Sequence, residues 1–181
     1  MKEQDINIQV ATIKELIDQG VEQTEILAIC NTLYDMTDFI CTDYPKHNSW
    51  FYQKHLPATL QPNSGRDIIF AYDQEGSFYG TSFVKRDDQE QKICTLFVDE
   101  KSRGLGVGTA LVEKSMEVLG TTKPMITLAD YKLPMFEGLI EKYGWEQTQE
   151  VSGLYNDRSV ELVFNGILDT SSTLDTSAPE Q

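Results

Sequence analysis

The sequence has few cysteines and histidines, and no pattern that groups them. Its 181 residues include three cysteines and two histidines. Cys30, Cys41 and Cys94 are widely spaced and form no CxxC pair, so neither a zinc knuckle nor a disulfide framework is expected. We therefore predict no metal site, and a protein that works in the reducing environment of the cytoplasm.

Positive charge is scarce as well. The 15 lysines and arginines face 29 aspartates and glutamates, and the formal net charge is -14. A surface this acidic opposes binding to the phosphates of nucleic acids and to anionic lipid headgroups. No apolar run approaches the ~18 residues of a membrane-spanning helix, and residues 1–9 contain no apolar core of a signal peptide. We predict no nucleic-acid partner and no membrane partner.

The remaining composition is that of one globular domain. Hydrophobic residues make up 40% and charged residues 24% of the chain, close to the average of soluble proteins. The segment 167–181 is rich in serine, threonine and acidic residues and has little to bury, so we predict a disordered tail there. The predicted domain covers residues 1–166.

The hydrophobic pattern changes its period along the chain. Residues 5–12 alternate as in a strand, and helical spacing follows over 13–20 and 24–33. The middle of the chain predicts an antiparallel meander, because polar turns separate three apolar segments of similar length. The later elements are then three strands, a helix, a strand, a helix and a closing hairpin, at 67–72, 78–85, 92–98, 109–119, 125–128, 134–142, 151–155 and 159–164. This order predicts an α/β (α+β) fold.

A glycine-rich segment follows the third strand of the meander. Gly104, Gly106 and Gly108 lead into a helix, and Arg103 precedes them. Glycines let the backbone come close to a ligand, and free N–H groups at a helix N-terminus suit a phosphate or pyrophosphate. The alternative is a tight turn that needs glycine only for its backbone angles. Two other phosphate loops are excluded, because neither GxGxxG nor the Walker A pattern fits these spacings.

The segment resembles the signature of the Gcn5-related N-acetyltransferase (GNAT) family, in which an arginine or glutamine is followed by x-x-Gly-x-(Gly/Ala). Here the match is Arg103-x-x-Gly106-x-Gly108. Val98, the motif Gly76-x-x-x-Gly80 and the motif Tyr143-Gly144-Trp145 also resemble family features at their expected places. The order of elements from 67 to 164 agrees too. The resemblance implies a mixed, mostly antiparallel sheet in which strands ending at Val98 and Leu128 form a splayed parallel pair, flanked by helices.

The resemblance also implies acetyl-CoA as cosubstrate and the primary amine of a small molecule or peptide as acceptor. The amine would attack the thioester directly, and the backbone N–H of Phe97 or Val98 would polarise its carbonyl group. The residues implied in binding acetyl-CoA are Leu96, Phe97, Val98, Arg103, Gly104, Leu105, Gly106, Val107, Gly108 and Thr109. Family members are often dimers, so a homodimer that pairs through 151–164 is a further expectation.

The chain departs from the family at the residue that protonates the leaving thiolate. The family carries a tyrosine four residues before the closing glycine, and Ile140 occupies that position here. Tyr143, one helical turn away, and Tyr131 are the two candidate substitutes. For the general base we consider Asp130, whose alternative role is to cap a helix. The departure leaves open a non-catalytic module that binds acyl-CoA.

Both histidines lie in an aromatic and locally basic stretch, 44–57. The family places this part of the chain over the acceptor site, so His47, Trp50 and His55 are candidate acceptor-binding residues. The alternative is an amphipathic helix whose aromatic residues lie in the core and whose lysines and histidines face solvent.

Overall fold

The computed structural model describes residues 7–169. Its elements, in chain order, are β1 (Gln9–Thr12), α1 (Ile13–Asp18), α2 (Gln23–Thr37), η1 (Asp38–Thr42), α3 (His47–Trp50), η2 (Phe51–His55), α4 (Leu56–Thr59), β2 (Arg66–Tyr72), β3 (Phe78–Arg86), β4 (Gln91–Val98), η3 (Glu100–Ser102), α5 (Val107–Leu119), β5 (Met125–Ala129), η4 (Asp130–Lys132), α6 (Leu133–Tyr143), β6 (Gln147–Ser152) and β7 (Val160–Phe164). The predicted mixed fold and the antiparallel meander of β2, β3 and β4 are confirmed.

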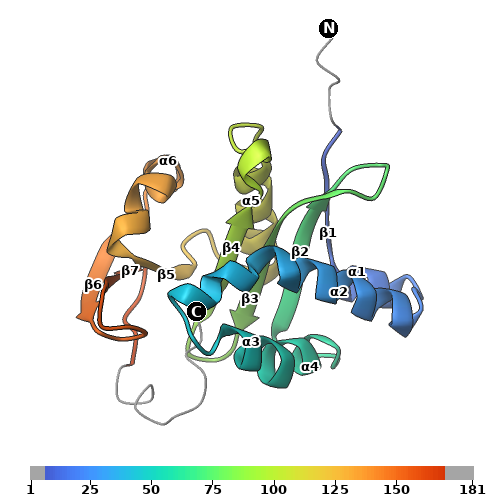
Figure 1. Cartoon of the computed structure of the whole chain (residues 1–181), viewed down its shortest axis with the longest axis horizontal. Helices are drawn as coiled ribbons and strands as arrows, with labels where there is room; N and C mark the ends of the chain where they lie inside the picture. The colour runs from blue at the N-terminus through green and yellow to red at the C-terminus, as the bar shows by residue number, and fades with distance from the viewer. Residues whose placement is uncertain (1–6, 170–181) are drawn as a thin grey trace, which may run out of the picture.

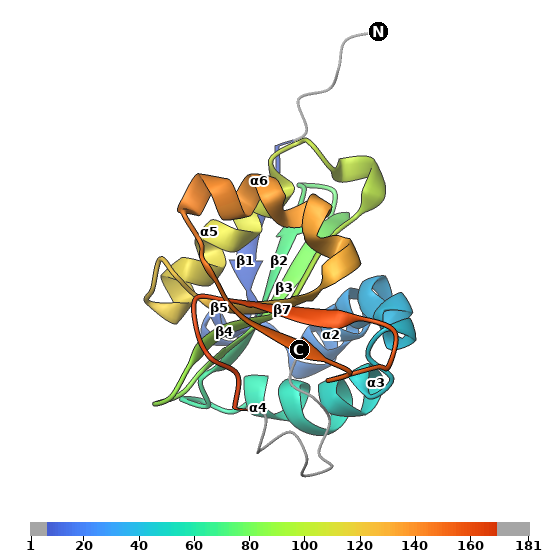
Figure 2. The same cartoon turned by 90° about the vertical axis from the view of Figure 1, so that its left-hand side faces the viewer.

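All seven strands form one sheet in the order β1-β2-β3-β4-β5-β7-β6. Within residues 7–169, only β4 and β5 run parallel to each other. Helices cover both faces of the sheet, with α5 and α6 on one side and α2, α3 and α4 on the other (Figures 1 and 2). Both faces of the sheet carry buried apolar side chains. In strand β2, Ile68 and Phe70 belong to one core cluster and Ile69 and Ala71 to another. Side chains that alternate along a strand point to opposite faces.

The parallel pair is short, and an irregularity in β4 explains why. On the β3 side, Phe83 is paired with Thr95 and Val84 with Ile93, so Cys94 is an extra residue in β4. A bulge of this kind bends the strand that carries it. On the other side, β4 pairs with β5 only through Lys92 and Ile93. The two strands therefore separate beyond the bulge.

Two predicted boundaries need correction. The first strand of the closing hairpin is Gln147–Ser152 rather than 151–155, because the chain turns at Gly153, where φ is +65°. The packed part of the chain also continues past residue 166. Leu168 is buried against Met125 and Val163, and its backbone N–H donates to Gln149. The rest of the predicted tail, 170–181, lies outside the described residues.

Among residues 7–169, no helix combines the length and the apolarity that crossing a bilayer requires. The same part of the chain contains no cluster of three or more histidine, cysteine, aspartate or glutamate side chains that could hold a metal ion.

Candidate active site

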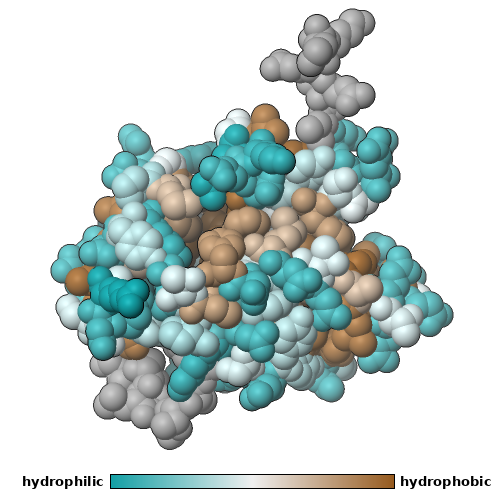
Figure 3. All heavy atoms as spheres, in the orientation of Figure 1, coloured by the Kyte–Doolittle hydropathy of each residue, from teal (hydrophilic) through white to brown (hydrophobic). Residues whose placement is uncertain are grey.

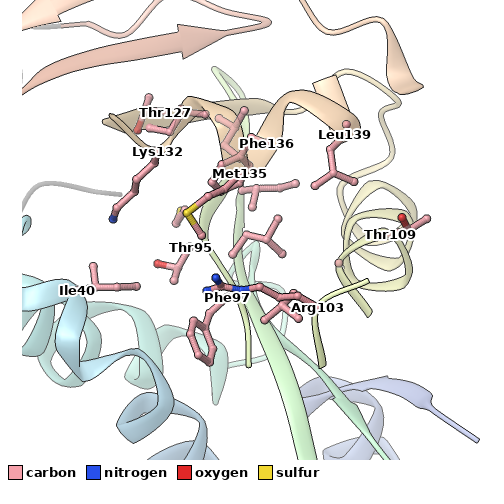
Figure 4. Close-up of a pocket in the computed structure, with 18 of the residues that line it drawn as sticks. Ile40, Thr95, Phe97, Arg103, Thr109, Thr127, Lys132, Met135, Phe136 and Leu139 are labelled. Atoms are coloured by element: carbon pink, nitrogen blue, oxygen red, sulfur yellow. The ribbon is translucent and has the colours of Figure 1, made fainter. Parts of the chain in front are cut away.

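A cavity of about 760 Å³ lies where β4 and β5 separate. Residues Ile93 to Val98 of β4 form one wall, and Ile126, Thr127 and Leu128 of β5 form the opposite wall. Helix α6 contributes Met135, Phe136 and Leu139 (Figure 4). In the space-filling view, apolar side chains gather in a hollow near the centre of this face (Figure 3). The splayed strands thus leave a mostly apolar slot in the middle of the sheet.

One end of the cavity is the glycine-rich loop. Gly104 and Gly106 have φ of +80° and +83°, a conformation that glycine adopts without strain. Gly106 precedes the first turn of α5, so the free N–H groups of that turn lie beside the cavity. Figure 4 shows Arg103 and Thr109 at this end. Backbone donors, the positive end of a helix dipole and a guanidinium together suit a phosphate group.

Most of the residues predicted to bind acetyl-CoA surround this cavity. Its lining includes Leu96, Phe97, Val98, Arg103, Gly104, Gly106, Gly108 and Thr109. The other two do not line it: Leu105 is 55% exposed, and Val107, the first residue of α5, is buried in the core.

The middle of the cavity contains an unsatisfied polar group. Thr95 is only 6% exposed, and its hydroxyl has no hydrogen-bond partner among the described residues. Figure 4 shows it between the side chains of Arg103 and Lys132. Burying a hydroxyl without a partner costs free energy. A polar group of a bound ligand would remove that cost.

A buried acid, Glu161, lies next to Tyr44, which lines the cavity. The Tyr44 hydroxyl donates a 2.8 Å hydrogen bond to Glu161 Oε1. Burial raises the pKa of Glu161 to about 7, against the hydrogen bond from Tyr44 and the positive charges of Lys92 and Lys132. Burial and the charge of Glu161 also raise the pKa of Tyr44 well above its usual value, so the phenol stays protonated and donates.

Lys132 also lines the cavity, close to Tyr44. Lys132 Nζ lies 3.0 Å from Asp43 Oδ2 and 5.4 Å from the centre of the Tyr44 ring. Burial alone would raise the pKa of Asp43, but the hydrogen bond from Tyr131 and the charge of Lys132 hold it below its usual value. Asp43 is therefore an ionised partner of Lys132 rather than a group that takes up protons near neutral pH.

The predicted acid and base residues are not gathered in one place. Tyr131 lines the cavity. Tyr143 does not line it, and its hydroxyl donates to Glu113 of α5 at 3.1 Å. Asp130 also lies outside the lining, and its carboxylate accepts from the backbone N–H of Tyr131 at 3.0 Å. Asp130 is the first residue of η4, and neither η4 nor α6 has a side-chain cap hydrogen bond, so the capping alternative is not borne out either.

His47, Trp50 and His55 lie in the core rather than at the cavity. All three are fully buried, and their rings stack with one another. His47 Nε2 lies 2.8 Å from the Thr37 hydroxyl, and His55 Nε2 lies 3.1 Å from the carbonyl oxygen of Asp67. The structure therefore places these three residues away from the acceptor end. The alternative of an amphipathic segment is right for the buried aromatics and the exposed Lys46 and Lys54, and wrong for the two histidines, which are buried.

Sequence reasoning missed Tyr44, Thr95, Lys132 and Glu161. One of them had a visible signal: Glu161 is an acidic residue inside an otherwise apolar strand segment, and a charge in such a place needs a partner. Tyr44 belongs to the aromatic stretch 44–57, but nothing local in the sequence links it to a residue 117 positions later.

Solved structures resemble this fold. Nourseothricin acetyltransferase is 19% identical with a TM-score of 0.50, and the match covers 55% of this chain and 64% of that one. A GNAT-family acetyltransferase from Elizabethkingia anophelis with acetyl-CoA bound is 14% identical, with a TM-score of 0.59 and coverage of 87% and 96%. The ribosomal-protein alanine N-acetyltransferase from Escherichia coli is 12% identical, with a TM-score of 0.56 and coverage of 90% and 96%. At these identities the likeness concerns the fold.

No curated protein matches the chain in sequence. The family described as "Acetyltransferase (GNAT) domain" matches residues 40–154, which span the meander, the glycine loop, the splayed strands and α6. The resemblance that the glycine motif indicated is confirmed: the chain belongs to the GNAT acetyltransferase family.

Proposed function

We propose that this protein is an N-acetyltransferase that moves an acetyl group from acetyl-CoA to the primary amine of a small molecule or peptide. The observation that carries the proposal is the continuity of the cavity. A loop suited to phosphates, the gap between β4 and β5, and the Tyr44 side chain, which donates to the buried Glu161, all border on the same hollow.

The residues present suit acetyl-CoA. Arg103 and the N-terminal N–H groups of α5 would hold its phosphates, since Gly106 and Gly108 place no side chain there. The exposed edge of β4 from Leu96 to Val98, released from β5 by the bulge, would pair with the pantetheine arm as an added strand would. When bound, acetyl-CoA supplies a thioester that an amine can attack. A backbone N–H at the splay, that of Phe97 or Val98, would donate to its carbonyl oxygen.

We propose a primary amine as acceptor. Direct attack on the thioester needs a nucleophile with a free electron pair, and an ammonium group gains one when it loses a proton inside the cavity. Among the similar structures, one is named for nourseothricin and one for an alanine of a ribosomal protein. These names support both a small-molecule and a peptide acceptor. The small number of cysteines and the lack of any CxxC pair support a cytoplasmic setting. Strand β6 lies at an edge of the sheet, where a second copy could pair to form a homodimer.

One observation favours a second candidate, a non-catalytic module that binds acyl-CoA. Helix α6 presents no tyrosine hydroxyl to the cavity within the described chain, since Ile140 is in the family's position and Tyr143 points elsewhere. A thiolate is a tolerable leaving group near neutral pH, since a free cysteine thiol has a pKa of about 8.5, so the lack of a general acid would slow the transfer rather than prevent it. We therefore keep the enzyme as the first proposal.

The test begins with thermal unfolding with and without acetyl-CoA. A ligand at a hundred times its Kd should add about 2.7 kcal/mol of stability and raise Tm by roughly 5–10 °C in a chain of this size. CoA release is then measured with 2-phenylethylamine, spermidine and a lysine-containing peptide with a blocked N-terminus. Binding with CoA release supports the enzyme, and binding without release supports the second candidate. No change in Tm would contradict both.

A further inference from the structure

We propose that Glu161 is the proton acceptor for the amine and that the Tyr44 hydroxyl passes the proton to it. The inference rests on the proposed function and deepens it, because it assigns a role that the family motif leaves open. It also replaces Asp130, whose carboxylate lies outside the cavity.

The first argument is access. Tyr44 lines the cavity, whereas Glu161 is absent from its lining and is only 2% exposed. The carboxylate is joined to the cavity through the 2.8 Å hydrogen bond from Tyr44. A proton that leaves a molecule in the cavity therefore has a short path to Glu161, through one phenol oxygen.

The second argument is place. Glu161 on β7 is paired with Ala129, the last residue of β5, so it lies beside the strand that forms one wall of the slot. Lys132, 5.4 Å from the Tyr44 ring, lies on the side of the cavity away from Arg103 (Figure 4). A ligand whose phosphates lie at the glycine loop would thus have its reactive end between the loop and Tyr44.

The third argument is charge. The charged groups that face Glu161 are Lys92 from β4 and Lys132 from η4, and Lys132 is already paired with Asp43. Burial outweighs the two lysines, and the pKa of Glu161 is raised to about 7. At the pH of the cytoplasm a large fraction of Glu161 is ionised, and its basicity is much higher than that of an exposed glutamate. General bases work best when their pKa is near the working pH.

The proposed step balances as follows. The N–H bond of the ammonium breaks and its proton forms an O–H bond with the Tyr44 oxygen, while the original Tyr44 proton moves to Glu161 Oε1. The phenol is regenerated, the carboxylate becomes a neutral acid, and the nitrogen keeps its electron pair for attack. No oxidant, reductant or further reactant is needed.

The test compares Glu161→Gln and Tyr44→Phe with the wild type, and uses Glu150→Gln as the matched control. Glu150 is an exposed carboxylate on the neighbouring strand β6 and does not line the cavity. Thermal unfolding and the Kd for acetyl-CoA are measured first, and we expect every variant to fold and to bind acetyl-CoA within threefold of the wild type. The rate of CoA release is then followed from pH 5.5 to 10 with the amine of the panel that reacts fastest.

We expect kcat/KM of the wild type to rise tenfold per pH unit up to about pH 7 and then to level off. In Glu161→Gln only the neutral amine can react, so the rise should continue towards the pKa of the amine, about 10 for an alkyl amine such as the lysine side chain. At pH 7 the variant should be about a hundredfold slower. Tyr44→Phe should resemble it, and Glu150→Gln should match the wild type.

The inference is overturned if Glu161→Gln and Tyr44→Phe keep the wild-type rate and pH profile. It is also overturned if the wild type itself shows no bend near pH 7. A wild type that binds acetyl-CoA but releases no CoA with any amine would contradict the proposed function instead. The two failures are therefore distinguishable.

Discussion

Gly80 on β3 lies directly against the carbonyl oxygen of Phe97 on β4. A Cβ atom at Gly80 would lie 2.5 Å from that oxygen and 3.0 Å from Leu111 Cδ1 of α5. Gly80 is the partner of Val98, the last residue of β4. The absence of a side chain at this one position lets α5 and the end of β4 pack together, and both border the cavity.

Gly80→Ala should therefore destabilise the protein. The new methyl group has no room and must displace a strand backbone, which we expect to lower the free energy of unfolding by about 2–3 kcal/mol. Urea denaturation measures the change. Gly138→Ala on α6 is the control, because its Cβ meets nothing within 4 Å and alanine should stabilise the helix by about 0.5–1 kcal/mol. Equal stability of Gly80→Ala and the wild type would contradict the packing argument.

Gly106→Ala should weaken acetyl-CoA binding as well as lower the stability of the protein, and the backbone strain of the alanine accounts only for the lower stability. Gly106 and Gly20 have φ of +83° and +80°, and a Cβ at either meets no protein atom within 4 Å. Both alanine variants should lose about 1 kcal/mol of stability. Only Gly106 lines the cavity, so only its variant should raise the Kd for acetyl-CoA, at least tenfold by calorimetry. Equal Kd values for the two variants would mean that the glycine serves the turn alone.

Arg103→Gln should lower the affinity for acetyl-CoA by about one to two orders of magnitude, the value of a lost hydrogen bond to a charged group. The loss should shrink as salt is added, because salt screens exposed charges. Lys101→Gln is the matched control, since it removes the same charge from the same loop at a residue that does not line the cavity. If both variants bind acetyl-CoA equally weakly, the phosphates are held by the total positive charge of the loop and not by a specific contact with Arg103.

Thr95→Val should stabilise the unliganded protein and weaken the complex. The hydroxyl of Thr95 is buried without a partner among the described residues, so its removal should raise the free energy of unfolding by about 1 kcal/mol. The Kd for acetyl-CoA should rise by roughly threefold to tenfold, the value of one hydrogen bond. Thr81→Val on β3 should have the opposite effect on stability, because its hydroxyl donates to the Ile69 carbonyl at 2.7 Å. A destabilised Thr95→Val would show that the hydroxyl is satisfied without ligand.

Glu161 should make stability fall as the pH rises from about 4.5 to 7. Its pKa in the folded protein is about 7, above the value near 4.3 of an unfolded chain, so over this range the folded state binds more protons. The stabilisation is complete below the unfolded pKa and lost as the pH passes 7. Urea denaturation at pH 5 and pH 8 should therefore show a smaller decline for Glu161→Gln than for the wild type. Parallel curves would place the pKa of Glu161 at its ordinary value.

The order of the elements and the glycine loop follow from the amino-acid sequence alone. Both depend on neighbours in the chain: alternation predicts β2 and β3, helical spacing predicts α5, and the glycines between Arg103 and Thr109 fix the turn before it. The family membership follows from the same local signals. Boundaries such as the start of β6 were less accurate, because strand pairing decides where a strand ends.

Contacts between side chains that are far apart in the chain depend on the tertiary structure. Cys94 is an extra residue of β4 only in relation to its partner strand β3, so the bulge is a property of the strand pairing. Beyond this bulge β4 separates from β5. Tyr44 and Glu161 are 117 positions apart, and His47 and His55 become core residues because α3 and η2 pack against the sheet. Periodicity along a chain tells which face of an element is apolar, but contact between distant residues depends on how those faces are stacked. The contact between the buried acid Glu161 and Tyr44 therefore follows from the tertiary structure and not from the local sequence.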